Sequence, residues 1–249
     1  ATDTELTRSV KSPHFFRTIA PDDTQGKLAV TFVTSNLKAK KIAVIHDKGA
    51  YGKGFADYAV AAIESIPGAK VVLYEGITKG ALNYSAVVQK MRREGAEAVI
   101  FGGYHPEASK LVAQMKKKRV KIPFIGPDGI KGNGFLDIAG KKAEGVYATG
   151  PRDVSRQRLN KQAHDAYRQK FGKEPGTFFD QGYAALQAVF NAANVAGSTD
   201  LSAMSKVLRE KPVETTLGAI HFDAHGDAIG VGFSVYQVRK GSFVELMGE

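Results

Sequence analysis

The fold is decided by residues 42–63, which read IAVIHDKGAYGKGFADYAVAAI. The stretch opens with a short β-branched run, residues 42–45, that is apolar on both faces and therefore typical of a buried parallel strand. After a polar turn, apolar residues recur at intervals of three and four from Phe55 to Ile63, as on one face of an amphipathic helix. A buried strand followed by such a helix predicts a βαβ unit with a right-handed crossover.

The alternation of strand and helix continues to about residue 125. Further strands are predicted at residues 71–74, 98–101 and 123–125, and the segments between them carry apolar residues at helical spacing. An earlier helix is predicted over residues 25–38. These elements together predict an α/β fold with an open parallel sheet.

The pattern changes after Thr149. Helices are predicted over residues 155–171, 179–196 and 201–209 without clear strands between them, and strands return at 219–222 and 232–238. Tyr183, Leu186, Phe190 and Ala193 share an apolar helix face that needs a sheet to pack on, and this region supplies little of one. The sequence therefore predicts one nearly complete α/β lobe and a second lobe made of helices short of a sheet.

The composition is that of a globular protein, with 43% hydrophobic and 24% charged residues among 249. No stretch approaches the ~20 apolar residues that cross a bilayer, and no signal-peptide pattern is present. The absence of cysteine excludes disulfides and thiolate metal sites within these residues. A net charge of +10 raises the question of nucleic-acid binding, but the basic runs at 38–41, 90–93 and 116–119 fall at predicted helix ends, where cations complement the helix dipole. We expect no nucleic-acid partner.

Candidate binding residues follow the predicted strands, because ligands of open α/β sheets bind beyond the carboxyl ends of the strands. Tyr51, Tyr104 and Asp128 each lie shortly after one strand. Phenols exchange hydrogen bonds and a carboxylate pairs with an ammonium group, so this set suits a small zwitterion. For any one of these residues, a role in satisfying loop backbone is the alternative.

Enzyme motifs are weak by comparison. Gly52-Lys53-Gly54 lacks the third glycine of a dinucleotide fingerprint, and the glycines of residues 126–134 lack the ending of a P-loop. No G-x-S-x-G nucleophile elbow occurs, and the six histidines show no metal-binding spacing. We predict no enzymatic activity, no catalytic residue, no metal and no cofactor.

Several stretches resemble one known family in collinear order over essentially the whole chain. They are residues 15–18 (FFRT), 22–26 (DDTQG), 45–48 (IHDK) with 51–52 (YG), 76–78 (GIT), 102–104 (GGY) with 106–107 (PE), 126–129 (GPDG) and 143–145 (AEG). The family is that of the periplasmic leucine/isoleucine/valine-binding proteins, which are type I periplasmic solute-binding proteins of branched-chain amino acid ABC transporters.

The resemblance implies roles for particular residues. Tyr51 and Tyr104 match the tyrosines that flank the ligand from the second lobe, and Asp128 matches the acidic residue that pairs with the ligand ammonium. The best-known members have glutamate there, so the shorter aspartate puts the position or identity of the ligand in question. Phe178 matches an aromatic residue of the side-chain pocket, with core packing beside Phe179 as the alternative.

The resemblance also implies two Rossmann-like lobes with parallel sheets, of which lobe 1 is incomplete because family members begin with a further strand–helix–strand region. Residues 1–17 would be a remnant of lobe 1, 18–149 the main part of lobe 2, 150–216 the helical part of lobe 1, and 217–249 a return to lobe 2. We expect a fragment that lacks half the ligand site and that dimerises or exchanges strands to cover its helices.

The implied function is that of a periplasmic receptor for an ABC importer, which binds amino acids, chiefly branched-chain or hydrophobic ones, by closing two lobes and then docks on a permease. One alternative is a ligand-sensing domain of the same fold from a regulator or receptor. The other is a nucleotide-binding α/β enzyme.

Overall fold

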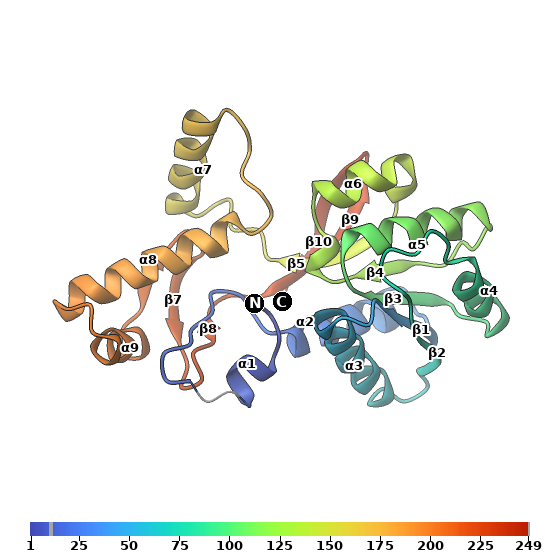
Figure 1. The fold of residues 1–249 in the computed structure, drawn as a ribbon, viewed down its shortest axis with the longest axis horizontal. Coiled ribbons are helices and arrows are strands. Elements are labelled where there is room, and N and C mark those ends of the chain that lie inside the picture. Colours follow the sequence, from blue (N-terminus) through green and yellow to red (C-terminus); the bar gives the residue numbers. More distant parts are fainter. Residues whose placement is uncertain (10–11, 249) are drawn as a thin grey trace. The chain divides into compact units, whose positions relative to one another are not determined.

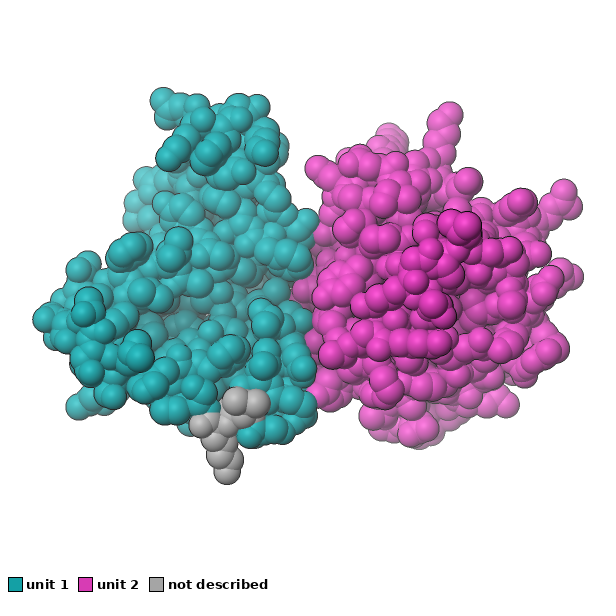
Figure 2. All heavy atoms as spheres, viewed as in Figure 1, with its two compact units in different colours: residues 1–21, 151–232 teal, residues 22–150, 233–249 magenta. Residues whose placement is uncertain are grey.

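The computed structural model describes residues 1–9 and 12–248, and it divides into two compact units (Figures 1 and 2). Unit 1 comprises residues 1–21 and 151–232, and unit 2 comprises residues 22–150 and 233–249. The chain thus passes between the units near residues 21, 150 and 232. No helix in the described part of the chain is long and apolar enough to cross a membrane.

Unit 2 contains a seven-stranded sheet in the order β10-β9-β5-β4-β3-β1-β2. Its strands are β1 (Lys41–His46), β2 (Lys70–Gly76), β3 (Ala98–Gly102), β4 (Phe124–Gly126), β5 (Tyr147–Pro151), β9 (Phe233–Arg239) and β10 (Ser242–Gly248). Strands β1 to β5 pair in parallel, and β9 and β10 form an antiparallel hairpin at one side. The predicted parallel α/β sheet is confirmed, including all four strands predicted before residue 126.

Helices cover both faces of this sheet, as Figure 1 shows. They are α2 (Asp22–Thr31), which continues as a π-helical turn (Phe32–Asn36), α3 (Ala50–Glu64), α4 (Ser85–Arg93), α5 (His105–Lys117) and α6 (Asn133–Ala139). Two 3₁₀ turns, Asp128–Ile130 and Gly140–Ala143, follow β4 and α6. Because side chains alternate along a strand, Ala43 and Ile45 enter the core beneath α4 and α5, whereas Ile42 and Val44 face the other way. All four are fully buried, which explains the continuous apolar run in the sequence.

Unit 1 is mainly helical, with α1 (Glu5–Arg8), α7 (Arg158–Phe171), α8 (Phe179–Ala196) and α9 (Leu201–Glu210). Its described strands, β6 (Val213–Thr215), β7 (Gly218–Phe222) and β8 (Ala228–Ile229), form one small antiparallel sheet. The predicted return to the other lobe at residue 217 is wrong. Strand β7 pairs with β6 and β8, so residues 217–232 stay in unit 1 and the chain crosses near Gly232.

Helix α8 carries apolar residues on two opposite sides. Ala184, Ala188 and Ala192 are buried in a core with residues of α9, β6 and β7. Leu186 and Phe190 lie two residues from Ala188, which is about 200° around a helix, and they are 59% and 66% exposed. The apolar side predicted to need a sheet is therefore uncovered within unit 1, and the alanine side does the packing.

The first residues of the chain are attached to unit 1 through Arg17. Its guanidinium is buried, forms an ion pair with Asp227 and donates a 2.7 Å hydrogen bond to the carbonyl oxygen of Asp3. Asp227 also accepts a hydrogen bond from Thr7 and forms an ion pair with Arg8. One buried ion pair thus joins three segments of unit 1.

Candidate functional site

The site lies at the carboxyl edge of the parallel sheet of unit 2, where helix α3 approaches β3 very closely. Asp47, directly after β1, accepts a 2.8 Å hydrogen bond from the backbone nitrogen of Gly49 and so shapes the turn into the helix. A Cβ atom on Gly52 would lie 2.3 Å from Asp47 Oδ1 and 2.6 Å from the carbonyl oxygen of Gly102. Glycine is therefore required at position 52, and it brings Tyr51 to the edge of the sheet.

The structure brings together Tyr51, Tyr104 and Asp128. The Tyr51 hydroxyl donates a hydrogen bond to Asp128 Oδ1 and accepts one of 3.1 Å from the backbone nitrogen of Gly129. The rings of Tyr51 and Tyr104 lie with their centroids 5.0 Å apart. Asp128 is only 4% exposed, whereas Tyr104 is 44% exposed. We call these three residues the tyrosine–aspartate cluster.

Burial dominates the electrostatics of the cluster. It raises the pKa of the Asp128 carboxyl above its ordinary value, although the hydrogen bond from Tyr51 and the nearby amide of Gln25 act in the opposite direction. Burial also raises the pKa of Tyr51 well above its usual value, and the neighbouring carboxylate of Asp128 adds to this effect. The Tyr51 hydroxyl is therefore a hydrogen-bond donor, and a bound cation would favour the ionised form of Asp128.

Other polar groups near the cluster were not predicted. Gln25 of α2 is fully buried, and its amide lies beside Asp128. Asp22, at the start of the same helix, is buried close enough for its charge to raise the pKa of Tyr51. The sequence signal was the DDTQG stretch at residues 22–26, which places several polar residues at the start of α2. This helix packs closely on α3, since a Cβ on Gly26 would lie 3.2 Å from the Cβ of Tyr58.

Lys79 lies at the same edge of the sheet, beside Tyr104 and Asp47. Lys79 Nζ lies 3.1 Å from the buried Asp47 Oδ2, as an ion pair, and 5.7 Å from the centroid of the Tyr104 ring. The buried carboxyl groups of Asp22, Asp47 and Asp128 all lie near the two tyrosines, and Lys79 pairs with Asp47. The local charge favours a ligand that brings a positive group.

Phe178 lies in unit 1, at the residue that precedes α8. Its side chain is 44% exposed, so it is not a core residue of that unit. Among the described residues, no group of three or more histidine and acidic side chains could hold a metal ion.

Comparison with known proteins places the chain in a family. The model of the periplasmic binding protein family matches residues 2–242. Leu/Ile/Val-binding protein homolog 1 of Brucella abortus is 39% identical over 228 residues. The leucine-, isoleucine-, valine-, threonine- and alanine-binding protein of Pseudomonas aeruginosa is 36% identical over 225 residues. These alignments cover 91% and 90% of this chain but only 61% and 60% of the two relatives.

Solved structures agree with this fold. The substrate-binding protein of a branched-chain amino acid transporter from Streptococcus pneumoniae, in complex with isoleucine, matches with a TM-score of 0.84 at 27% identity. A leucine-binding protein from Thermotoga maritima gives a TM-score of 0.90 at 23% identity. The matches cover 99% of this chain and 71% and 70% of those chains. From the family match over residues 2–242 and these similarities, the chain belongs to the periplasmic binding protein family.

Proposed function

We propose that this chain is part of the amino-acid receptor of an ABC importer, and that it acts outside the cytoplasm by binding and release without making or breaking bonds. The observation that carries the proposal is the tyrosine–aspartate cluster at the carboxyl edge of the sheet, in a chain 39% identical to a Leu/Ile/Val-binding protein homolog. A transport permease is the proposed macromolecular partner.

In the proposed complex, Asp128 pairs with the ligand ammonium and the Tyr51 hydroxyl holds that carboxylate in place. Tyr104, being exposed, packs on the ligand, and Phe178 contacts an aliphatic side chain. Because a ligand stabilises a closed form only by touching both lobes, groups of unit 1 must join the site for closure to occur.

The chain by itself is proposed to bind amino acids weakly, because it spans only about three fifths of the length of the relatives that it matches. The test is a titration with leucine, isoleucine and valine, followed by amide chemical shifts. We expect shifts centred on residues 51, 104 and 128, loss of these shifts in Asp128→Asn, and their retention in Asp137→Asn, which changes an exposed carboxylate on α6. Equal shifts in Asp128→Asn would contradict the site, and a micromolar calorimetric affinity would contradict weak binding.

We also propose that unit 1 associates with a second copy of the chain through the exposed side of α8, by dimerisation or strand exchange. Leu186, Val189 and Phe190 are adjacent on the helix and all exposed, and a contiguous apolar patch of this kind is typical of an interaction surface. Light scattering should show a concentration-dependent mass above that of one chain, 26.7 kDa. A single-chain mass at all concentrations would contradict this proposal.

A further inference from the structure

A cleft lies at the other end of the same sheet, opposite the edge that carries the tyrosine–aspartate cluster. It has a volume of about 430 Å³ and is lined by the end of α5, the segment from α5 to β4 and the start of β5. Its floor is made by Val112, Met115, Phe124 and Val146, all buried and all apolar. Phe124 is the first residue of β4, whereas Asp128 follows its last residue, so this cleft is separate from the tyrosine–aspartate cluster. We call it the basal cleft. Its volume lies within the range of small-molecule sites, roughly 300–1,000 Å³.

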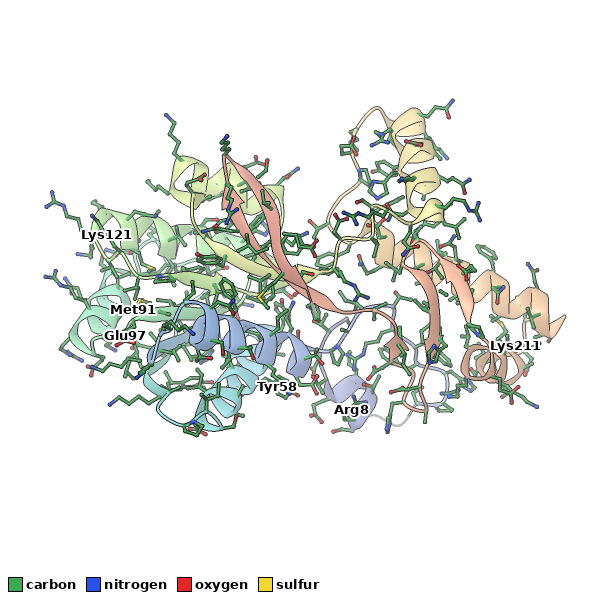
Figure 3. All side chains as sticks on the ribbon, turned by 180° about the vertical axis from the view of Figure 1, so that it is seen from behind. Arg8, Tyr58, Met91, Glu97, Lys121 and Lys211 are labelled. Atoms are coloured by element: carbon green, nitrogen blue, oxygen red, sulfur yellow. The ribbon has the colours of Figure 1, made fainter. Side chains whose placement is uncertain are left out.

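Three cations stand at the mouth of the basal cleft: Lys116, Arg119 and Lys121. All three are exposed, and no acidic side chain lines the cleft. Among the ion pairs of the described residues, none includes these three side chains; Lys116 Nζ lies 3.4 Å from the backbone carbonyl oxygen of Glu144. Figure 3 shows Lys121 at the outer side of unit 2. An apolar floor below an uncompensated positive rim complements a molecule with a hydrocarbon body and an anionic head.

Arg119 occupies a backbone position that does not favour arginine. Helix α5 ends in a Schellman motif, in which the backbone nitrogen of Val120 donates to the carbonyl oxygen of Met115 at 2.9 Å, and that of Arg119 donates to Lys116 at 3.1 Å. In this motif the residue directly before Val120 must adopt the left-handed conformation. That residue is Arg119, whose φ is 57°. Glycine is the usual residue there because a Cβ is disfavoured in this conformation. The hydrogen bonds of this motif are made by backbone atoms, and the exposed Arg119 side chain is not part of them.

We propose that the basal cleft binds an amphipathic carboxylate with a medium-length aliphatic tail. The tail packs on Met115, Phe124 and Val146, and the planar guanidinium of Arg119 receives the carboxylate through two parallel hydrogen bonds. Lys116 and Lys121 add attraction as point charges. This inference is independent of the proposed amino-acid site, because it uses none of its residues.

The experiment is a titration of the whole chain with decanoate, measured by calorimetry and localised by amide shifts, with decanol as the uncharged analogue. We expect shifts at residues 112–124 and 145–147, an affinity for decanoate at least tenfold higher than that for decanol, and weaker binding in high salt. Arg119→Gly should lower the affinity at least tenfold while leaving the melting temperature unchanged or higher, because glycine relieves the left-handed strain. Lys121→Gln should weaken binding less.

The matched control is Lys117→Gln, which removes an exposed cation of α5 that does not line the cleft. It should bind decanoate like the wild type, as should Asp128→Asn. Equal affinity for decanol and decanoate, equal losses in Arg119→Gly and Lys117→Gln, or shifts centred on α8 would overturn the proposal. Binding to phosphatidylglycerol vesicles without binding to decanoate would also overturn it, and would assign the three cations to a membrane surface.

Discussion

Asp128 combines burial with a negative charge, and the residues around it determine how well that charge is tolerated. The Tyr51 hydroxyl donates a hydrogen bond to the carboxyl group of Asp128 and the buried amide of Gln25 lies nearby, but burial still raises the pKa of Asp128. The sequence could predict that Tyr51, Tyr104 and Asp128 meet, because each follows a strand of one parallel sheet. It could not predict Gln25 or Asp22, since a polar residue in a helix is usually exposed and their burial follows from tertiary packing.

The raised pKa of Asp128 predicts how the Asp128→Asn variant changes stability with pH. The carboxyl group binds its proton more tightly in the folded state than in the unfolded state, where its pKa is near 3.8. Protonated Asp128 therefore stabilises the fold below that pH. This stabilisation is lost as the pH rises through the pKa of the folded state. Asparagine imitates the protonated form. Urea unfolding should therefore show Asp128→Asn to be more stable than the wild type at neutral pH and equal to it in acid. A difference that does not depend on pH would contradict this account.

At the scale of elements, periodicity predicted β1 to β4, β9 and helices α2 to α5 of unit 2, because both faces of its sheet are covered, but it did not predict β5 or α6. Strand β10 was missed, since its residues are exposed or half-buried and Glu245 interrupts the apolar pattern. In unit 1, large side chains such as Phe190 marked the apolar side of α8, but the packing side consists of alanines, which give a weak signal. The error at residue 217 had a related cause, because a strand by itself does not indicate which sheet it joins.

The close approach of α3 and β3 can be tested with two glycines of one helix. In Gly52→Ala the new methyl group would meet Asp47 and the backbone of Gly102, so we expect a loss of about 1–3 kcal/mol in the free energy of unfolding. The control is Gly54→Ala, where a Cβ meets nothing within 4 Å. Alanine should stabilise the helix there by roughly 0.5–1 kcal/mol. Equal effects in urea unfolding would show that the approach is not tight.

The buried ion pair of Arg17 and Asp227 predicts that a single conservative substitution will lower the free energy of unfolding considerably. Asp227→Asn leaves the guanidinium buried without its counter-charge, which should cost about 3–5 kcal/mol. Asp165→Asn removes an exposed carboxylate that pairs with Arg168 and should cost about 0–1 kcal/mol. Hydrogen exchange should also quicken at residues 3–8 in Asp227→Asn only. Similar losses in both variants would contradict a structural role for the buried pair.

At the scale of the whole molecule, the exposed side of α8 is the feature that we expect to determine whether two copies of the chain associate in solution. The double variant Leu186→Lys/Phe190→Lys places charges on side chains that are already exposed, so its melting temperature should change little. Sedimentation should show less association than in the wild type. The control Leu82→Lys changes another exposed side chain, in unit 2, and should leave association unchanged. Association that persists in the double variant would locate the interface elsewhere.

The place of β9 beside β5 in the sheet of unit 2 has a consequence for biosynthesis. Strands β1 to β5 leave the ribosome before residues 151–232 of unit 1, and β9 and β10 leave it only after them. Until then the hydrogen-bonding edge of β5 is open, and an open edge of this kind can pair with another nascent chain. Slow translation through residues 151–232 would lengthen that exposure, so we expect the yield of folded protein to depend on how soon the β9–β10 hairpin is made.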